Sequence, residues 1–131
     1  ADAEAVWNRI SKSRASIGAL LLNQSVIAGI GNVYRAEVLF ALGIHPQRAG
    51  RTISRSEFDR LWETICRWMA LGAKQNRIIT TADQIEMPPS QIGKAERLAI
   101  YKKKYCTRCG GPVESWPLAA RTIYSCAACQ G

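Results

Sequence analysis

The sequence predicts a mainly α-helical fold, in which a helical bundle precedes a small β-hairpin that carries four cysteines. Two observations support this prediction: apolar residues recur at helical spacing over most of the chain, and two C-x-x-C pairs lie near its end. With 131 residues, 47% of them hydrophobic, the chain can form one core and a small appendage. We therefore expect a helical domain over residues 1–93 and a cysteine-rich hairpin over residues 94–131.

Three short helices are expected in the first part of the chain. Apolar spacing predicts one over residues 3–10, and Ser16 can cap a second that continues through Leu22. A third is expected over residues 33–42 and closed by Gly43, because glycine readily adopts the left-handed conformation that ends many helices.

The fourth helix has the clearest pattern. Ser54 and Glu57 form a capping box, and apolar residues follow at helical intervals to an expected end at Gly72. These apolar residues are Phe58, Leu61, Trp62, Ile65 and Met69. We expect Cys66 to be a small buried hydrophobic residue, and the tryptophans of this helix to lie in the core rather than to stack on bases.

After the fourth helix the pattern becomes irregular. Residues 78–81 are rich in β-branched side chains, which predicts a short strand. Residues 85–93 contain two adjacent prolines and predict a loop. Three lysines at residues 102–104 then lead into the cysteine region.

A glycine-rich turn lies within residues 24–35. The apolar helix is interrupted at Gly29 and Gly31, which tolerate positive φ, and a new helix follows with Asn32 as its expected N-cap. A glycine turn before a helix leaves backbone N–H groups unsatisfied at the positive end of the helix dipole, where a phosphate can bind. The alternative is an ordinary turn between two helices.

The chain is strongly basic, with a net charge of +8 and an isoelectric point near 9.6. This charge favours a polyanionic partner such as nucleic acid. Residues 94–131 hold seven Lys and Arg against two Glu. We expect no membrane partner, because no apolar run approaches the length of a span. Ala1 opens the chain without a methionine, which suggests a piece of a longer protein.

Cys106, Cys109, Cys126 and Cys129 form two C-x-x-C pairs separated by sixteen residues, the spacing of a four-cysteine zinc site. Such pairs argue for a metal in a reducing, intracellular compartment rather than for disulfides. We expect one structural zinc ion, because four thiolates leave no open position for catalysis. An iron–sulfur centre and a redox pair are the alternatives.

Residues 113–116 and 122–125 read as the two strands of a hairpin between the cysteine pairs, with residues 118–121 at its tip. Arg121 is the notable side chain there. On a generic hairpin it is a solvated charge, but on a rigid finger it can hold a phosphate.

Together these motifs resemble the C-terminal part of the formamidopyrimidine-DNA glycosylase and endonuclease VIII family. Residues 21–24, 27–34 and 37–39 resemble the helix–two-turn–helix motif of that family. Residues 120–122 and 126–130 resemble its zinc finger. The resemblance covers most of the chain and implies a mainly α fold with a helix–two-turn–helix motif and an appended four-cysteine zinc β-hairpin.

The resemblance implies a base-excision-repair enzyme, a bifunctional DNA glycosylase and AP lyase, that acts on double-stranded DNA with a damaged or abasic site. Asn32, with the turn amide of Gly31, matches the asparagine that grips a backbone phosphate near the lesion. Arg121 matches the finger arginine that holds phosphates around the extruded nucleotide. The four cysteines match the zinc ligands.

Three positions depart from the family pattern. The family nucleophile is an N-terminal proline followed by glutamate on a separate domain, whereas this chain begins Ala1-Asp2. Asn23 stands where aspartate is more usual, and Ala120 where glycine is. We expect no catalytic residue within this chain, little or no activity from it alone, and the N-terminal catalytic domain as its partner.

Three other functions fit parts of the sequence. A similar helix–turn–helix geometry occurs in a ribosomal protein that contacts RNA, so a non-catalytic RNA-binding or general DNA-binding module is one alternative. A zinc-ribbon domain for protein interaction is the second. The third is a small redox protein that uses its C-x-x-C pairs.

Overall fold

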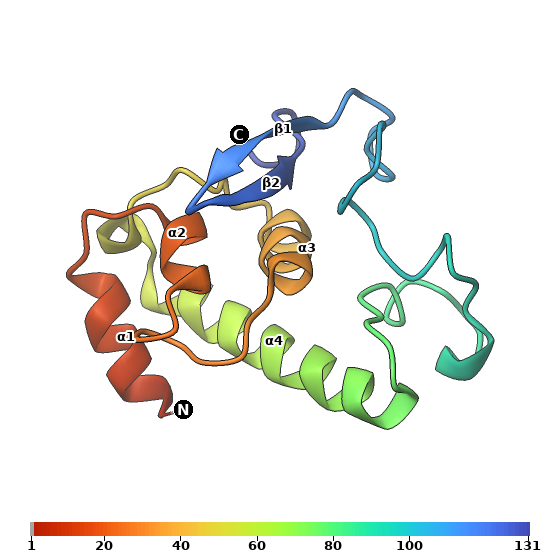
Figure 1. The fold of residues 1–131 in the computed structure, drawn as a ribbon, viewed down its shortest axis with the longest axis horizontal. Helices are drawn as coiled ribbons and strands as arrows, with labels where there is room; N and C mark the ends of the chain where they lie inside the picture. Colours follow the sequence, from red (N-terminus) through yellow and green to blue (C-terminus); the bar gives the residue numbers. More distant parts are fainter. Residues whose placement is uncertain (1) are drawn as a thin grey trace.

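The computed structural model describes residues 2–131 and shows a group of helices with a small two-stranded sheet on one side (Figure 1). The helices are α1 (Ala3–Ser11), α2 (Ile17–Leu22), α3 (Asn32–Leu42) and α4 (Arg55–Gln75). Two short 3₁₀ turns are η1 (Gly50–Thr52) and η2 (Pro89–Gln91), and the strands are β1 (Glu114–Leu118) and β2 (Arg121–Ser125). The prediction of a mainly helical fold with one small hairpin is confirmed. Within the described residues, no helix is both long and apolar enough to cross a membrane.

The long helix α4 begins at the predicted capping box. The Ser54 hydroxyl accepts from the Glu57 N–H at 3.0 Å, and the Glu57 carboxylate accepts from the Ser54 N–H at 2.9 Å. The expected end at Gly72 is wrong, because α4 continues to Gln75 and closes at Asn76 with φ of 55°. Gly72 serves packing instead: a Cβ there would lie 2.5 Å from the Tyr34 hydroxyl.

The main core lies between the four helices. Aliphatic residues of α1, α2 and α3 pack there against one face of α4, and Trp68 is 5% exposed. Trp62 is partly buried against the same core, as predicted. The prediction for Cys66 is wrong: this residue is exposed. It follows the buried Ile65 by one helical step of about 100°, which turns its side chain away from the core.

The predicted strand at residues 78–81 is also wrong. Ile79 is fully buried, but the segment pairs with no strand among the described residues. Its polar groups bond to a neighbouring irregular segment, as when the Thr80 N–H donates to the Arg97 carbonyl at 2.9 Å. Burial and β-branched composition are therefore satisfied without a ladder. Residues 85–93 form the predicted loop, interrupted only by η2.

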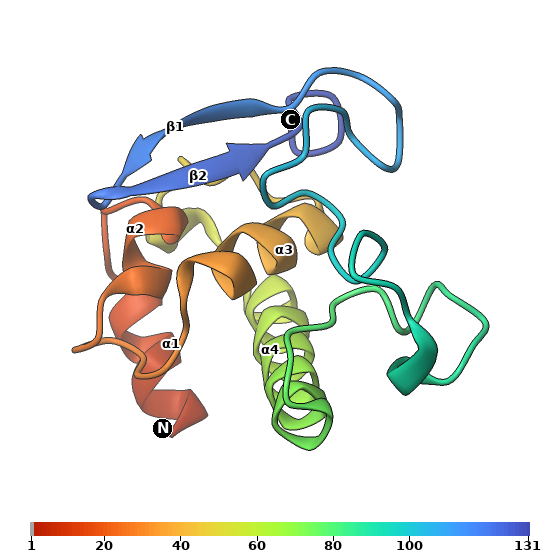
Figure 2. The same ribbon diagram turned by 45° about the vertical axis from the view of Figure 1, so that its right-hand side comes forward.

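The hairpin lies across α2 and α3, on the side opposite α4 (Figure 2). Strands β1 and β2 are antiparallel, and Leu118 pairs with Arg121 at the end of the ladder. Ala119 and Ala120 connect them with φ of 57° and 64°, the signs of a type I′ turn. From β2, Ile123 is fully buried against residues of α3, which form a second apolar cluster with the cysteine segment. The division at residues 93 and 94 stays a prediction.

Candidate metal centre and nucleic-acid interface

The four predicted cysteines meet at one point. Their sulfur atoms all lie within 4.8 Å of one another. The Cys106 and Cys129 sulfurs are 3.8 Å apart, and those of Cys109 and Cys126 are 3.5 Å apart. Four thiolates at about 2.3 Å from a tetrahedral ion have sulfurs about 3.8 Å apart. The cysteines are therefore positioned to bind a metal ion.

Backbone N–H groups favour the thiolate form of Cys106, which is the form that binds a metal cation. The N–H groups of Arg108 and Cys109 donate to the Cys106 sulfur at 3.3 and 3.4 Å. Burial raises the pKa of the Cys106 thiol, but these donors, together with hydrogen bonds from the Cys109 and Cys126 side chains, outweigh burial and lower that pKa to about 7. Gly110, with φ of 77°, provides the turn that aims them.

The second cysteine pair is fixed by a glutamine that sequence reasoning assigned no role of its own. Gln130 is fully buried. Its Oε1 accepts from the Cys126 N–H at 2.8 Å, and its Nε2 donates to the Ile44 carbonyl at 3.0 Å. One side chain thus joins the metal-binding turn to the segment that follows α3. Its place directly after the last cysteine was the available signal.

The glycine turn enters α3 without a side-chain cap. Gly29 has φ of 88°, whereas Gly31 is extended with φ of −91° and ψ of 177°. Gly31 is the N-cap and Asn32 the first helical residue, so the predicted N-cap was wrong by one position. Asn32 cannot cap because its side chain is bonded elsewhere. A Cβ at Gly31 would meet nothing within 4 Å, so this side of the turn is open.

The Asn32 side chain joins α3 to the hairpin. It is 8% exposed, and its Nδ2 donates to the Thr122 carbonyl at 2.8 Å. Its Oδ1 accepts from the Nε and Nη2 of Arg35 at 3.1 and 2.7 Å. The amide group is therefore held in one orientation.

Arg35 is fully buried, and sequence reasoning missed it. Its guanidinium donates to the carbonyls of Gly18 at 3.2 Å, Leu118 at 2.8 Å and Arg121 at 3.1 Å. Burial lowers the pKa of Arg35 to about 10, and the nearby charge of Arg121 acts in the same direction. An arginine in an amphipathic helix reads as a solvated charge, so only its i+3 spacing from Asn32 pointed to this contact.

Gly31, Asn32 and Arg121 line one hollow of about 320 Å³. Its other walls come from the end of α2, the glycine turn and the hairpin turn: Leu22, Gln24, Ile30, Ala119 and Ala120. Arg121 is exposed at this site. Arg121 therefore lies beside Gly31 and Asn32, although about ninety residues separate it from them in the sequence.

Glu37, on the other side of α3, was also missed as a structural residue. It is 1% exposed, and its carboxylate accepts from the N–H groups of Ala99, Ile100 and Tyr101 at 2.7 to 2.8 Å. The Thr80 hydroxyl donates to it as well. Glu37 thus fixes the segment that leads into the cysteine region.

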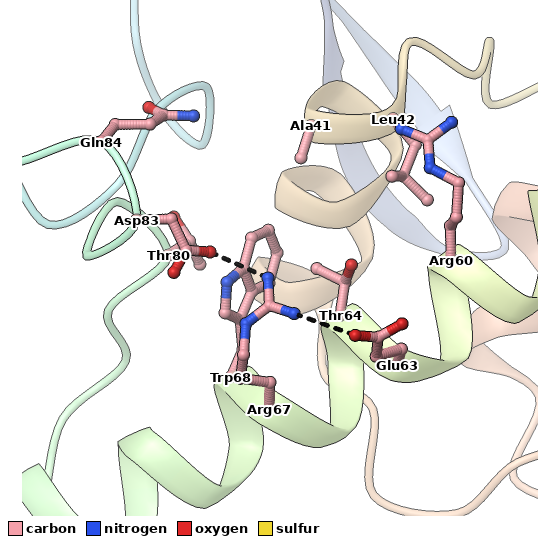
Figure 3. Close-up of a pocket in the computed structure, with 10 residues that line it drawn as sticks. All are labelled: Ala41, Leu42, Arg60, Glu63, Thr64, Arg67, Trp68, Thr80, Asp83 and Gln84. Atoms are coloured by element: carbon pink, nitrogen blue, oxygen red, sulfur yellow. Dashed lines mark hydrogen bonds and ion pairs between the residues drawn. The ribbon is translucent and has the colours of Figure 1, made fainter.

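A different hollow lies between α4 and the segment after it (Figure 3). Arg67 bonds there to Asp83 at 2.8 Å and lies 3.9 Å from Glu63. These carboxylates offset the positive charge of Arg67. The hollow contains none of the predicted site residues, and we assign it no role.

Comparison with known proteins identifies a family to which the sequence is similar. Residues 1–84 match the family described as the formamidopyrimidine-DNA glycosylase H2TH domain. Endonuclease 8 1 of Mycobacterium tuberculosis is 40% identical over 133 residues, which cover 99% of this chain and 50% of that protein. Formamidopyrimidine-DNA glycosylase of Corynebacterium jeikeium is 30% identical over 131 residues, covering 98% of this chain and 46% of that protein.

A solved structure has the same fold. The complex of Lactococcus lactis Fpg with DNA containing an abasic site matches with a TM-score of 0.78 and 26% identity. The match covers 99% of this chain and 47% of that one, so the chain spans about half the length of its relatives. By its sequence match, its fold and its four cysteines positioned to bind a metal ion, the chain belongs to the formamidopyrimidine-DNA glycosylase and endonuclease VIII family and corresponds to its C-terminal part.

Proposed function

We propose that this chain is the DNA-holding part of a base-excision-repair DNA glycosylase and AP lyase, and that it grips the phosphate backbone around a damaged or abasic nucleotide. The hollow shared by Gly31, Asn32 and Arg121 carries the proposal. In this view the segment from α2 through the glycine turn to α3 is the helix–two-turn–helix motif of the family.

The chemistry of the hollow suits a phosphate. The uncapped start of α3 presents backbone N–H groups at the positive end of the helix dipole. Arg121 adds a guanidinium, which binds phosphate oxygens with charge-assisted hydrogen bonds. Such contacts hold and orient DNA without reading its sequence. They can offset the cost of extruding a nucleotide, which is a few kcal/mol.

The metal that we propose is one zinc ion with a structural role. Cys106, Cys109, Cys126 and Cys129 would supply four thiolates, a set that zinc favours and that leaves no position for water. The ion would fold the base of the hairpin and so hold Arg121 against α3. Base removal and strand cleavage we assign to an N-terminal catalytic domain outside these 131 residues.

Fluorescence anisotropy with the zinc-loaded chain tests the grip. Three ligands of equal length are compared: a duplex with a stable abasic analogue, an intact duplex and an RNA duplex. We expect the abasic duplex to bind most tightly, and Arg121→Ala to weaken that binding about tenfold, the effect of one charge-assisted contact. Asn32→Ala is expected to act in the same direction.

Lys74→Ala is the matched control, since it removes one exposed positive charge near the end of α4, away from the hairpin (Figure 1). It should change affinity less than twofold at about 0.15 M salt. Equal affinity for abasic and intact duplexes, unaffected by Arg121→Ala, would contradict the proposal. Preference for RNA would favour the ribosomal type of module.

A further inference from the structure

A contribution to the stability of the fold does not by itself explain the buried position and the hydrogen bonds of Arg35. Its guanidinium is fully buried and makes five hydrogen bonds, all to neutral oxygens. Among residues 2–131 no carboxylate forms an ion pair with it. Burying a charge without a counter-ion is costly, so an arginine at this place calls for another reason.

The bonds of Arg35 converge on the hairpin turn. Leu118 and Arg121 are the residue pair that closes the turn, and the two terminal nitrogens of Arg35 each bond to one of their carbonyls. Between them, Ala119 and Ala120 hold positive φ, a conformation unfavourable for alanine. The guanidinium therefore fixes a turn that its own residues do not favour.

The same guanidinium also fixes Asn32. Its Nε and Nη2 both donate to Oδ1 of Asn32, which leaves the amide nitrogen facing the hairpin at Thr122. One planar group thus connects two of the residues that line the phosphate hollow. A lysine could not do so, because a single ammonium lacks the planar fork that reaches acceptors on several sides.

We propose that Arg35 is a positioning residue that sets the distance and orientation between Arg121 and Asn32 at the phosphate site, without itself touching DNA. This inference rests on the proposed function of those two residues. Its uncompensated charge, just beneath the hollow, would further favour an anion there.

A double-mutant cycle between Arg35 and Arg121 tests the proposal. The zinc-loaded chain and its variants Arg35→Lys, Arg121→Ala and the double variant are titrated against the abasic duplex by anisotropy. Circular dichroism and zinc content establish that each variant folds. Arg77→Lys is the matched control, because Arg77 also donates to two loop carbonyls, those of Pro89 and Ile92.

We expect Arg35→Lys to weaken abasic binding about tenfold in the parent chain but less than twofold when Arg121 is already alanine. Arg77→Lys should have the same small effect in both backgrounds. Full binding by Arg35→Lys would overturn the proposal, as would equal losses in both backgrounds. If Arg121→Ala itself has no effect, the proposed function fails instead.

A measurement on the unsubstituted chain covers the case in which Arg35→Lys does not fold. In ¹⁵N NMR spectra the Arg35 Nε–H should exchange with water far more slowly than that of the exposed Arg121. It should also shift when the abasic duplex is added. Exchange as fast as that of an exposed arginine would show that the hydrogen bonds of Arg35 to the hairpin turn and to Asn32 do not persist in solution, and would overturn the proposal.

Discussion

The helical part and the cysteine hairpin differ in what holds them together. The four helices bury one large apolar cluster, in which Ile10, Leu39 and Leu61 are at most 1% exposed. Among the apolar residues of the two strands, only Ile123 is buried to that degree, and its apolar neighbours include Phe40 of α3. Hydrophobic burial therefore stabilises the helices, whereas we expect the hairpin to depend on the proposed metal and on the surface of α3 against which it packs.

Polar groups define the boundary between these two parts. Asn32, Arg35 and Gln130 are buried side chains that bond across it. Apolar contacts alone would let the hairpin slide on α3, whereas directional hydrogen bonds permit one register. The comparison teaches that the apolar contacts supply attraction here and the buried polar ones supply alignment.

Loss of the metal should have the largest effect and should separate the two parts. Cys126→Ser is expected to abolish zinc binding and to unfold the hairpin, since zinc contributes on the order of 10 kcal/mol at such sites. The α-helical signal in circular dichroism should largely persist, and abasic binding should be lost. Cys66→Ser is the control, because Cys66 is exposed and lies outside the cluster. Joint unfolding of helices and hairpin would contradict the distinction.

A cavity in the helical core should destabilise the helices and leave zinc binding by the folded chain unchanged. Leu61 is 1% exposed, and Leu61→Ala is expected to lower the free energy of unfolding by about 2–5 kcal/mol, measured by urea titration. Zinc content should stay at one ion per folded chain. The neighbouring exposed Arg60→Ala should change stability by less than about 0.5 kcal/mol. A Leu61→Ala protein that loses zinc while still helical would argue that the hairpin is the weaker part.

The strained turn between β1 and β2 offers a way to stabilise the hairpin without changing the helices. Ala120 has φ of 64°, so Ala120→Gly should stabilise the zinc-bound hairpin by about 1 kcal/mol. The exposed Ala128 is outside the positive-φ set, so Ala128→Gly should destabilise by about 0.5 kcal/mol. Competition with a zinc chelator measures both. Equal effects of the two substitutions would mean that the turn is not strained in solution.

The smallest effect concerns the cap of α4. The Arg48 guanidinium, and then the Ser54 N–H, lower the pKa of Glu57 from 4.5 to about 2. A carboxyl whose pKa is lowered by folding stabilises the fold above pH 4.5, and this contribution is lost as the pH falls toward 2. Glu57→Gln should therefore melt below the parent at pH 7 and together with it at pH 2, as thermal unfolding can show. A difference that is constant with pH would contradict this account.

The sequence predicted those features whose cause lies within a short stretch. Ser54 and Glu57 predict the start of a helix, and the two C-x-x-C pairs predict a metal site, because the spacing of these residues alone determines their geometry. The side chain of Arg35 could not be predicted in the same way. Apart from the nearby Asn32, its acceptors lie 17 to 86 residues away, and the approach of those on the hairpin depends on how the hairpin packs. The prediction of a strand at residues 78–81 was wrong for the same reason, since a strand needs a pairing partner that the local sequence does not reveal.

The position of Glu37 on α3 has a consequence for protein engineering. Arg35 and Glu37 are two residues apart, and a helical step of about 100° each sends them to nearly opposite sides of the helix. One grips the hairpin tip, and the other grips the chain that enters the cysteine segment at Ile100. Both ends of the cysteine-containing hairpin segment are therefore fixed by hydrogen bonds to the same helix, α3. A design that grafts this hairpin segment onto another protein would have to include α3, because Arg35 and Glu37 of that helix hold the segment in place.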